Sequence, residues 1–202
     1  MSTAVPEQNE GGKMDITANI ALATTEDARA FYQTAKQRLL AVYNWYEICA
    51  VPVSTFMLTD PHGREIKRPV QEGDYFKIDI PGPGTSTGDG FDWVRVESIE
   101  EESLNQADTI SMTVRPAANP LNEKEDTAHF FKDTATSTFQ VKRIGNEVYA
   151  EVHGRNELAN TDTDQMTDNI RNTLVGWSAK LGLSAPQWKS LVTGLVKKQD
   201  GN

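Results

Sequence analysis

The sequence of residues 137–155, STFQVKRIGNEVYAEVHGR, decides the fold of this chain. Apolar and polar residues alternate along both halves, and Gly145 and Asn146 between them are typical of a tight hairpin turn. With these two residues in the turn, one face collects the facing pairs Phe139–Val152, Val141–Ala150 and Arg143–Val148, and the other collects Thr138–His153, Gln140–Glu151 and Lys142–Tyr149. Because a slip of one residue would mix the two sets, the pattern predicts this register and a sheet with one buried and one polar face.

Several shorter segments before the hairpin also alternate between apolar and polar residues, which is typical of half-buried strands. Turn signals separate them, among them Asp60-Pro61-His62-Gly63 and Gly73-Asp74. The predicted strands are residues 14–22, 54–59, 64–67, 75–80, 92–99 and 109–115.

A helical pattern follows the first strand. Thr24 and Asp27 form a pair like a capping box, and apolar residues follow at spacings of three and four. This pattern predicts one helix over residues 25–46, which ends before Pro52 because proline cannot continue a helix.

Helical spacing returns in the last forty residues. Apolar residues from Met166 to Leu181 share one stripe, and Gly182 stands where a helix commonly ends. Ser184 and Gln187 form a second capping box, which predicts a final helix that continues to about Lys198.

The element order predicts one α+β domain over residues 14–198. In this domain a curved antiparallel sheet of about six to seven strands is covered by the N-terminal helix and the C-terminal helices, since neither pattern can bury its apolar face alone. Residues 1–13 are polar and contain Gly11-Gly12, so we expect a flexible tail, and we expect residues 199–202 to be disordered.

This order of a strand, a long helix, a run of antiparallel strands and a C-terminal helix resembles the helix-grip architecture of the START-like superfamily. The resemblance covers residues 14–198. In that fold a curved sheet wraps around the last helix and often encloses an apolar cavity. The resemblance therefore implies a cavity between the sheet and the C-terminal helices.

The composition excludes several classes of function. The 202 residues carry 20 Lys and Arg against 29 Asp and Glu, a formal net charge of −9, which argues against a nucleic-acid-binding surface. A single cysteine, Cys49, excludes an intrachain disulfide. No stretch approaches 18 apolar residues and residues 1–13 hold no apolar signal segment, so we expect no membrane span and a cytoplasmic location.

Known catalytic and cofactor motifs are missing from the sequence. The Gly-rich loop of residues 81–90, PGPGTSTGDG, has no lysine and no helix after it, so we interpret it as a flexible hairpin loop or a contact site rather than a phosphate cradle. No pair among His62, His129 and His153 has a metal-ligand spacing, and Cys49 lies in an apolar stretch after a helix end, as a small buried side chain would. We therefore expect no catalytic residue, metal or cofactor, and an enzyme is the least favoured class.

One polar group on the hairpin leaves two interpretations open. Gln140, Glu151, His153 and Arg155 share a strand face, on which Glu151 and His153 are a candidate acid–base or ligand-orienting pair. The other interpretation is an ordinary charged exterior, and it is favoured.

Two functional hypotheses remain. The first is a soluble, non-catalytic binding protein for an apolar small molecule between the sheet and the C-terminal helices, with the candidate lining residues Phe76, Met112, Phe139, Val141 and Trp177. The alternative is an interaction or assembly module for a protein partner or a second copy of the chain. It would use the Gly-rich loop of residues 81–90 and the aromatic end of the first helix, with Tyr43, Trp45 and Tyr46.

Overall fold

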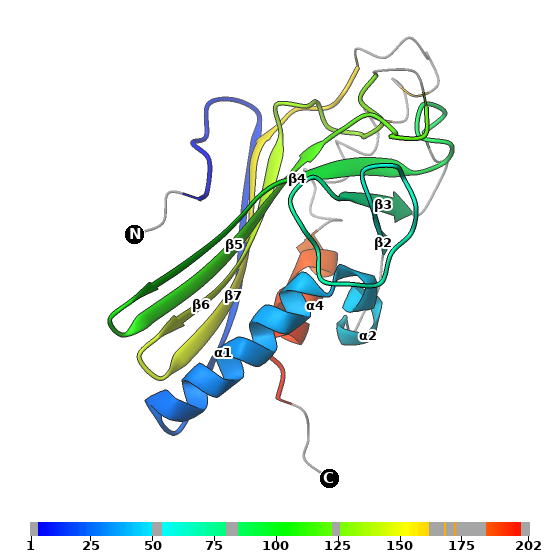
Figure 1. Cartoon of the computed structure of the whole chain (residues 1–202). Coiled ribbons are helices and arrows are strands. Elements are labelled where there is room, and N and C mark those ends of the chain that lie inside the picture. Colours follow the sequence, from blue (N-terminus) through cyan, green and yellow to red (C-terminus); the bar gives the residue numbers. More distant parts are fainter. Residues whose placement is uncertain are drawn as a thin grey trace.

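The chain folds into an α+β domain with a seven-stranded antiparallel sheet, as the sequence predicts (Figure 1). The structure is a computed structural model, which describes residues 4–49, 54–79, 85–122, 126–161, 168, 172 and 185–198. The strand order is β1-β7-β6-β5-β4-β3-β2, so β1 and β2 are the two edges of the sheet. The elements are β1 (Gly12–Ala21), α1 (Thr25–Leu40), η1 (Val42–Asn44), α2 (Trp45–Ile48), β2 (Thr55–Thr59), β3 (Tyr75–Asp79), β4 (Asp92–Leu104), β5 (Ala107–Pro116), β6 (Thr136–Ile144), β7 (Glu147–Glu157) and α4 (Ala185–Leu195).

The β6–β7 hairpin has the predicted register. Phe139 faces Val152 and Gln140 faces Glu151, with the turn at Gly145-Asn146. The apolar set lies on the concave face, where α1 and α4 pack against it (Figure 1). The sequence pattern therefore specified both the strand pairing and the buried face.

The first helix is shorter than predicted, because the chain breaks at Ala41 instead of continuing to Tyr46. At Ala41 the backbone leaves the helical region, with φ −89° and ψ 59°, and its amide closes the helix on the carbonyl of Gln37. The chain then turns through η1 and α2. The break lets Trp45 enter the core, with 1% of its surface exposed, while Tyr46 remains 55% exposed.

Two strand predictions are also corrected. Residues 64–67 form one bridge, Thr59–Glu65, rather than a strand. The Asp60 carboxylate accepts the amides of His62 and Arg64 in a tight turn, and the chain then leaves the sheet toward α1, where the Val70 amide binds the carbonyl of Leu40. The β4–β5 hairpin is longer than predicted, because β4 continues through its acidic residues as far as Leu104.

The N-terminal segment of residues 4–11 lies against the sheet. Strand β1 begins at Gly12 rather than Met14. Ahead of it, the Asn156 carboxamide accepts the amides of Asn9 and Glu10, at 2.8 and 3.2 Å, and donates to the carbonyl of Glu7 at 3.1 Å. The flexibility expected of residues 1–13 remains a prediction.

The C-terminal helix is confirmed as α4, while the predicted helix over residues 166–181 and the end of the chain at residues 199–202 fall mostly or wholly outside the described residues. No helix in the described part of the chain is long and apolar enough to cross a membrane.

Candidate functional site

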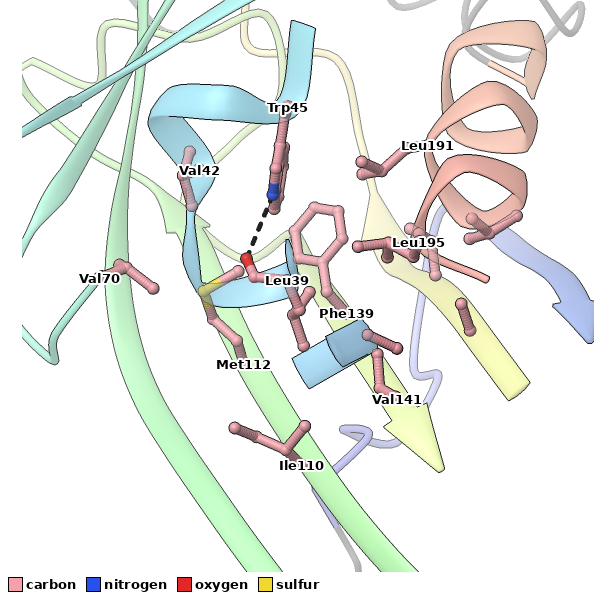
Figure 2. Close-up of a cluster of buried hydrophobic side chains, with 14 of the residues drawn as sticks. Leu39, Val42, Trp45, Val70, Ile110, Met112, Phe139, Val141, Leu191 and Leu195 are labelled. Atoms are coloured by element: carbon pink, nitrogen blue, oxygen red, sulfur yellow. Dashed lines mark hydrogen bonds between the residues drawn. The ribbon is translucent and has the colours of Figure 1, made fainter. Parts of the chain in front are cut away.

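The predicted apolar lining residues lie together on the concave face of the sheet. Phe76, Met112, Phe139 and Val141 come from β3, β5 and β6, and each is at most 1% exposed. Figure 2 shows Met112, Phe139 and Val141 on neighbouring strands. Trp177, the fifth residue predicted for this lining, lies outside the described residues. These four residues belong to the buried core of the domain, and their role in lining a ligand site stays a prediction.

Aromatic side chains occupy the space between the sheet and the helices. The Trp45 ring lies 5.4 Å from Phe56, 5.7 Å from Phe76 and 5.1 Å from Phe139, measured between ring centres. Trp188 of α4 lies 5.4 Å from Phe139. The indole N–H of Trp45 donates to the carbonyl of Leu39 at the end of α1, at 3.1 Å (Figure 2). Among the described residues, the two indole rings and the phenylalanine rings therefore pack directly against one another on the concave face.

An open pocket lies elsewhere, between the N-terminal half of α1 and the tip of the β4–β5 hairpin, which occupy the same end of the molecule (Figure 1). Its volume is about 530 Å³. Its walls are Arg29, Ala30 and Gln33 from the helix and Ser103, Leu104, Asn105 and Asp108 from the hairpin. Sequence reasoning missed these residues, because it ended the strand of residues 92–99 before the hairpin tip. The Asn105-Gln106 pair was the available turn signal.

Two ion pairs border this pocket. Lys36 of α1 reaches across to Glu101 of β4, with Nζ 2.5 Å from a carboxylate oxygen. Arg143, which is fully buried, donates from Nε to Asp108 at 2.6 Å and from a terminal nitrogen to the carbonyls of Gln106 and Gly145. Partial burial alone would raise the pKa of Asp108, but the bonds from Arg143 and Ser103 outweigh it and lower the pKa. Asp108 is therefore ionised and its charge is neutralised by Arg143.

A buried phenol lies in this charged environment. Tyr32 is 1% exposed, and its hydroxyl has no hydrogen-bond partner among the described residues. Burial raises the pKa of Tyr32, and the charges of Glu101 and Asp108 raise it further. The phenol is therefore neutral and can donate one hydrogen bond if an acceptor reaches it.

The predicted polar cluster lies on the opposite, outer face of the sheet and is centred on a residue that the sequence did not suggest, Asp15 of β1. His153 lies 2.6 Å from Asp15 through Nδ1 and 3.0 Å from Glu151 through Nε2. Arg155 donates to the same Asp15 oxygen at 2.7 Å. Gln140 is buried nearby but donates to the Ser111 hydroxyl instead. Missing Asp15 has a simple cause: the pattern did not show that β1 lies beside β7.

The protonation of this cluster follows from its geometry. Hydrogen bonding to Glu151 raises the pKa of His153, although burial opposes this, and Asp15 raises it further. Partial burial favours a higher pKa for Asp15, but hydrogen bonds from His153, Arg155 and Lys13 lower it to about 2. A His153 imidazolium that donates from both nitrogens has no free lone pair to take up a proton or bind a metal. The arrangement instead ties the edge strand β1 to β7.

The two other candidates from the sequence are the Cys49 thiol and the Gly-rich loop of residues 81–90, and the described part of each contacts other side chains of the domain. Burial raises the pKa of the Cys49 thiol, which makes it a poor nucleophile. In the described half of the Gly-rich loop, the Asp168 carboxylate accepts the amides of Ser86 and Thr87 at 2.8 and 3.0 Å. Over the described residues, no group of three or more His, Cys, Asp or Glu side chains is arranged to hold a metal ion.

Comparison with known proteins gives no family assignment. No family model and no curated protein matches the chain. Solved structures that match include a protein from Arthrobacter aurescens (TM-score 0.39, 12% identity, 91% of this chain and 85% of that one) and two helix-grip proteins of the START type. One of these two is Ara h 8.0201, with a TM-score of 0.34 and 10% identity over 93% of this chain and 100% of that one. The other is truncated norcoclaurine synthase from Thalictrum flavum, with a TM-score of 0.35 and 9% identity over 96% of this chain and 100% of that one.

Proposed function

We propose that this chain is a non-catalytic binding protein for a small molecule, and that the ligand binds in the pocket between α1 and the β4–β5 hairpin. The pocket itself supports this proposal, because its volume of about 530 Å³ is within the usual range for small-molecule sites, roughly 300–1,000 Å³. Its walls combine a cation, a carboxylate, two carboxamides and a hydroxyl with the apolar side chains of Ala30 and Leu104. Such a mixture can orient a ligand and also bury part of it.

Binding is favoured over catalysis by the state of the reactive side chains. His153 is held between two carboxylates, and the Cys49 thiol is buried with a raised pKa. Neither side chain lines the pocket. The pocket therefore offers hydrogen-bonding groups but no activated nucleophile or base.

A second candidate is the apolar ligand that the sequence suggests, held between the sheet and the C-terminal helices. The observation in its favour is the set of aromatic rings around Trp45 on the concave face. Such a ligand must displace Trp45 or Trp188, so its binding should change the tryptophan fluorescence strongly. A ligand in the pocket beside α1 should leave these two rings in place.

The experiment combines native mass spectrometry with two matched variants. The purified full-length chain is examined for a copurified small molecule, and a fragment library is screened by ligand-observed NMR. Ala30→Trp places a large ring on the pocket wall, whereas Thr34→Trp places the same ring on an exposed position of α1 outside the pocket.

We expect ligand binding to be lost in Ala30→Trp and retained in Thr34→Trp. The proposal is wrong if the chain carries no small molecule and binds no fragment, or if both variants bind as the natural sequence does. The oligomeric state from the same spectra tests the alternative of an assembly module.

A further inference from the structure

We infer that the pocket binds an amphipathic organic acid, whose carboxylate pairs with Arg29 and whose apolar part lies against Ala30 and Leu104. This inference rests on the proposed function and adds the chemical class of the ligand. It is carried by the charges around the pocket, by the unused hydrogen-bond donors on its walls and by its apolar rim.

Two charged side chains line the pocket, Arg29 and Asp108, and further charged residues lie beside it. Lys36 neutralises Glu101, and Arg143 neutralises Asp108. Arg29 is exposed and makes no hydrogen bond or ion pair with any residue that the structure describes, although its charge contributes to lowering the pKa of Asp108. Arg29 is therefore a cation on the pocket wall whose N–H donors have no partner among the described residues, in a chain whose net charge is −9.

A guanidinium is well suited to a carboxylate, because its planar N–H groups form two parallel hydrogen bonds to the two oxygens. Gln33 lies one helical turn after Arg29, and Asn105 lies across the pocket at the hairpin tip, so both carboxamides can add N–H donors. Asp108 would repel an anion if its charge were free, but Arg143 and Ser103 already bind its carboxylate.

The apolar part of the ligand is suggested by the rim of the pocket. Leu104 lines the pocket and is 63% exposed, so its side chain is accessible to the apolar part of a ligand. An acyl chain or a ring anchored at Arg29 would cover the exposed side chain of Leu104 on the pocket wall.

The test compares three probes with the same eight-carbon chain and different head groups: octanoate, 1-octanol and octylammonium. Binding is followed on the full-length chain by amide chemical shifts, with shifts expected at Ala30, Gln33 and Asn105. We expect octanoate to bind at least tenfold more tightly than the other two probes. Arg29→Gln should weaken octanoate binding about tenfold, whereas Arg29→Lys should have an intermediate effect.

Arg95→Gln is the matched control, because Arg95 is exposed on β4 but does not line the pocket. It should change octanoate affinity less than twofold. The inference is overturned if octanol or octylammonium binds as well as octanoate, or if Arg29→Gln has no effect. In either case the proposed function still stands if Ala30→Trp blocks binding, whereas failure of all three probes and of the fragment library overturns both.

Discussion

Trp45 is the residue whose removal best tests how the interior is filled. In Trp45→Ala a side chain that is 1% exposed leaves the space between β3, β6 and the helices. Core Trp→Ala changes usually cost about 3–5 kcal/mol. Here three aromatic contacts are lost, each worth about 0.5–1.5 kcal/mol, together with one hydrogen bond of about 1 kcal/mol to the end of α1. We therefore expect a loss of about 4 kcal/mol in the free energy of unfolding.

The assay is urea unfolding followed by circular dichroism, with thermal unfolding as a second measurement. For a domain of this size a loss of about 4 kcal/mol lowers Tm by roughly 8–16 °C. Tyr46→Ala is the control from the adjacent position, and because Tyr46 is 55% exposed it should change stability by less than about 0.5 kcal/mol.

A rescue experiment distinguishes lost packing from general damage. The Trp45→Ala cavity is lined by phenylalanine rings and should bind free indole, as engineered apolar cavities bind small aromatic molecules. Indole at ten times its dissociation constant would restore about 1.4 kcal/mol. A cost below about 2 kcal/mol, or no stabilisation by indole in a variant that still folds, would refute the filled interior.

Three further predictions concern other parts of the molecule. His153→Gln should lower the free energy of unfolding at pH 6 and make it depend less on pH above that. The folded-state pKa of His153 is raised above 6.5, so the stability that its charge contributes is complete below pH 6.5 and is lost as the pH rises through the folded-state pKa. Urea unfolding between pH 6 and 9 measures this, and an unchanged pH profile contradicts it. Gly194→Ala should lower the free energy of unfolding in urea by about 1–3 kcal/mol, because the added methyl would lie 2.1 Å from the carbonyl oxygen of Ile48. An unchanged free energy of unfolding would mean that α4 packs less closely against α2 than the structure shows. Asn156→Ala should speed amide hydrogen exchange in residues 4–11 without changing exchange in the hairpin, and equal exchange in both proteins would show that this side chain does not hold the segment.

The sequence predicted the fold where local and long-range signals agree. In the β6–β7 hairpin, the turn at Gly145-Asn146 and the alternation of apolar residues specify the same register, so both the pairing and the buried face were correct. At the end of α1 they disagree: helical spacing continues past Ala41, but burial of the Trp45 ring against three phenylalanines requires a break. Such a tertiary contact is not visible in a local pattern.

The site was harder to predict, because each of its parts joins segments that are distant in the sequence. Asp15 meets His153 only because β1 lies beside β7, and the hairpin pattern says nothing about that neighbour. The pocket depends on the angle between α1 and a hairpin tip, so no motif contains Arg29 and Asn105 together. The sequence predicted Phe76 and Phe139 as lining residues of one site, but it did not show that the Trp45 ring would contact both of them.

Trp45 also explains why the proposed ligand site lies at the N-terminal end of α1. The C-terminal half of this helix, with Ala35 and Leu39, is buried against the sheet, and Trp45 closes the space just beyond it. Because α1 packs on β6 and β7, the tip of the β4–β5 hairpin extends past it and is joined to the helix by the Lys36–Glu101 pair. The opening between helix and hairpin is therefore a consequence of how the rest of the concave face is filled. A chain without the Trp45 ring would have its free volume where the sequence predicted it, beside Phe76 and Phe139.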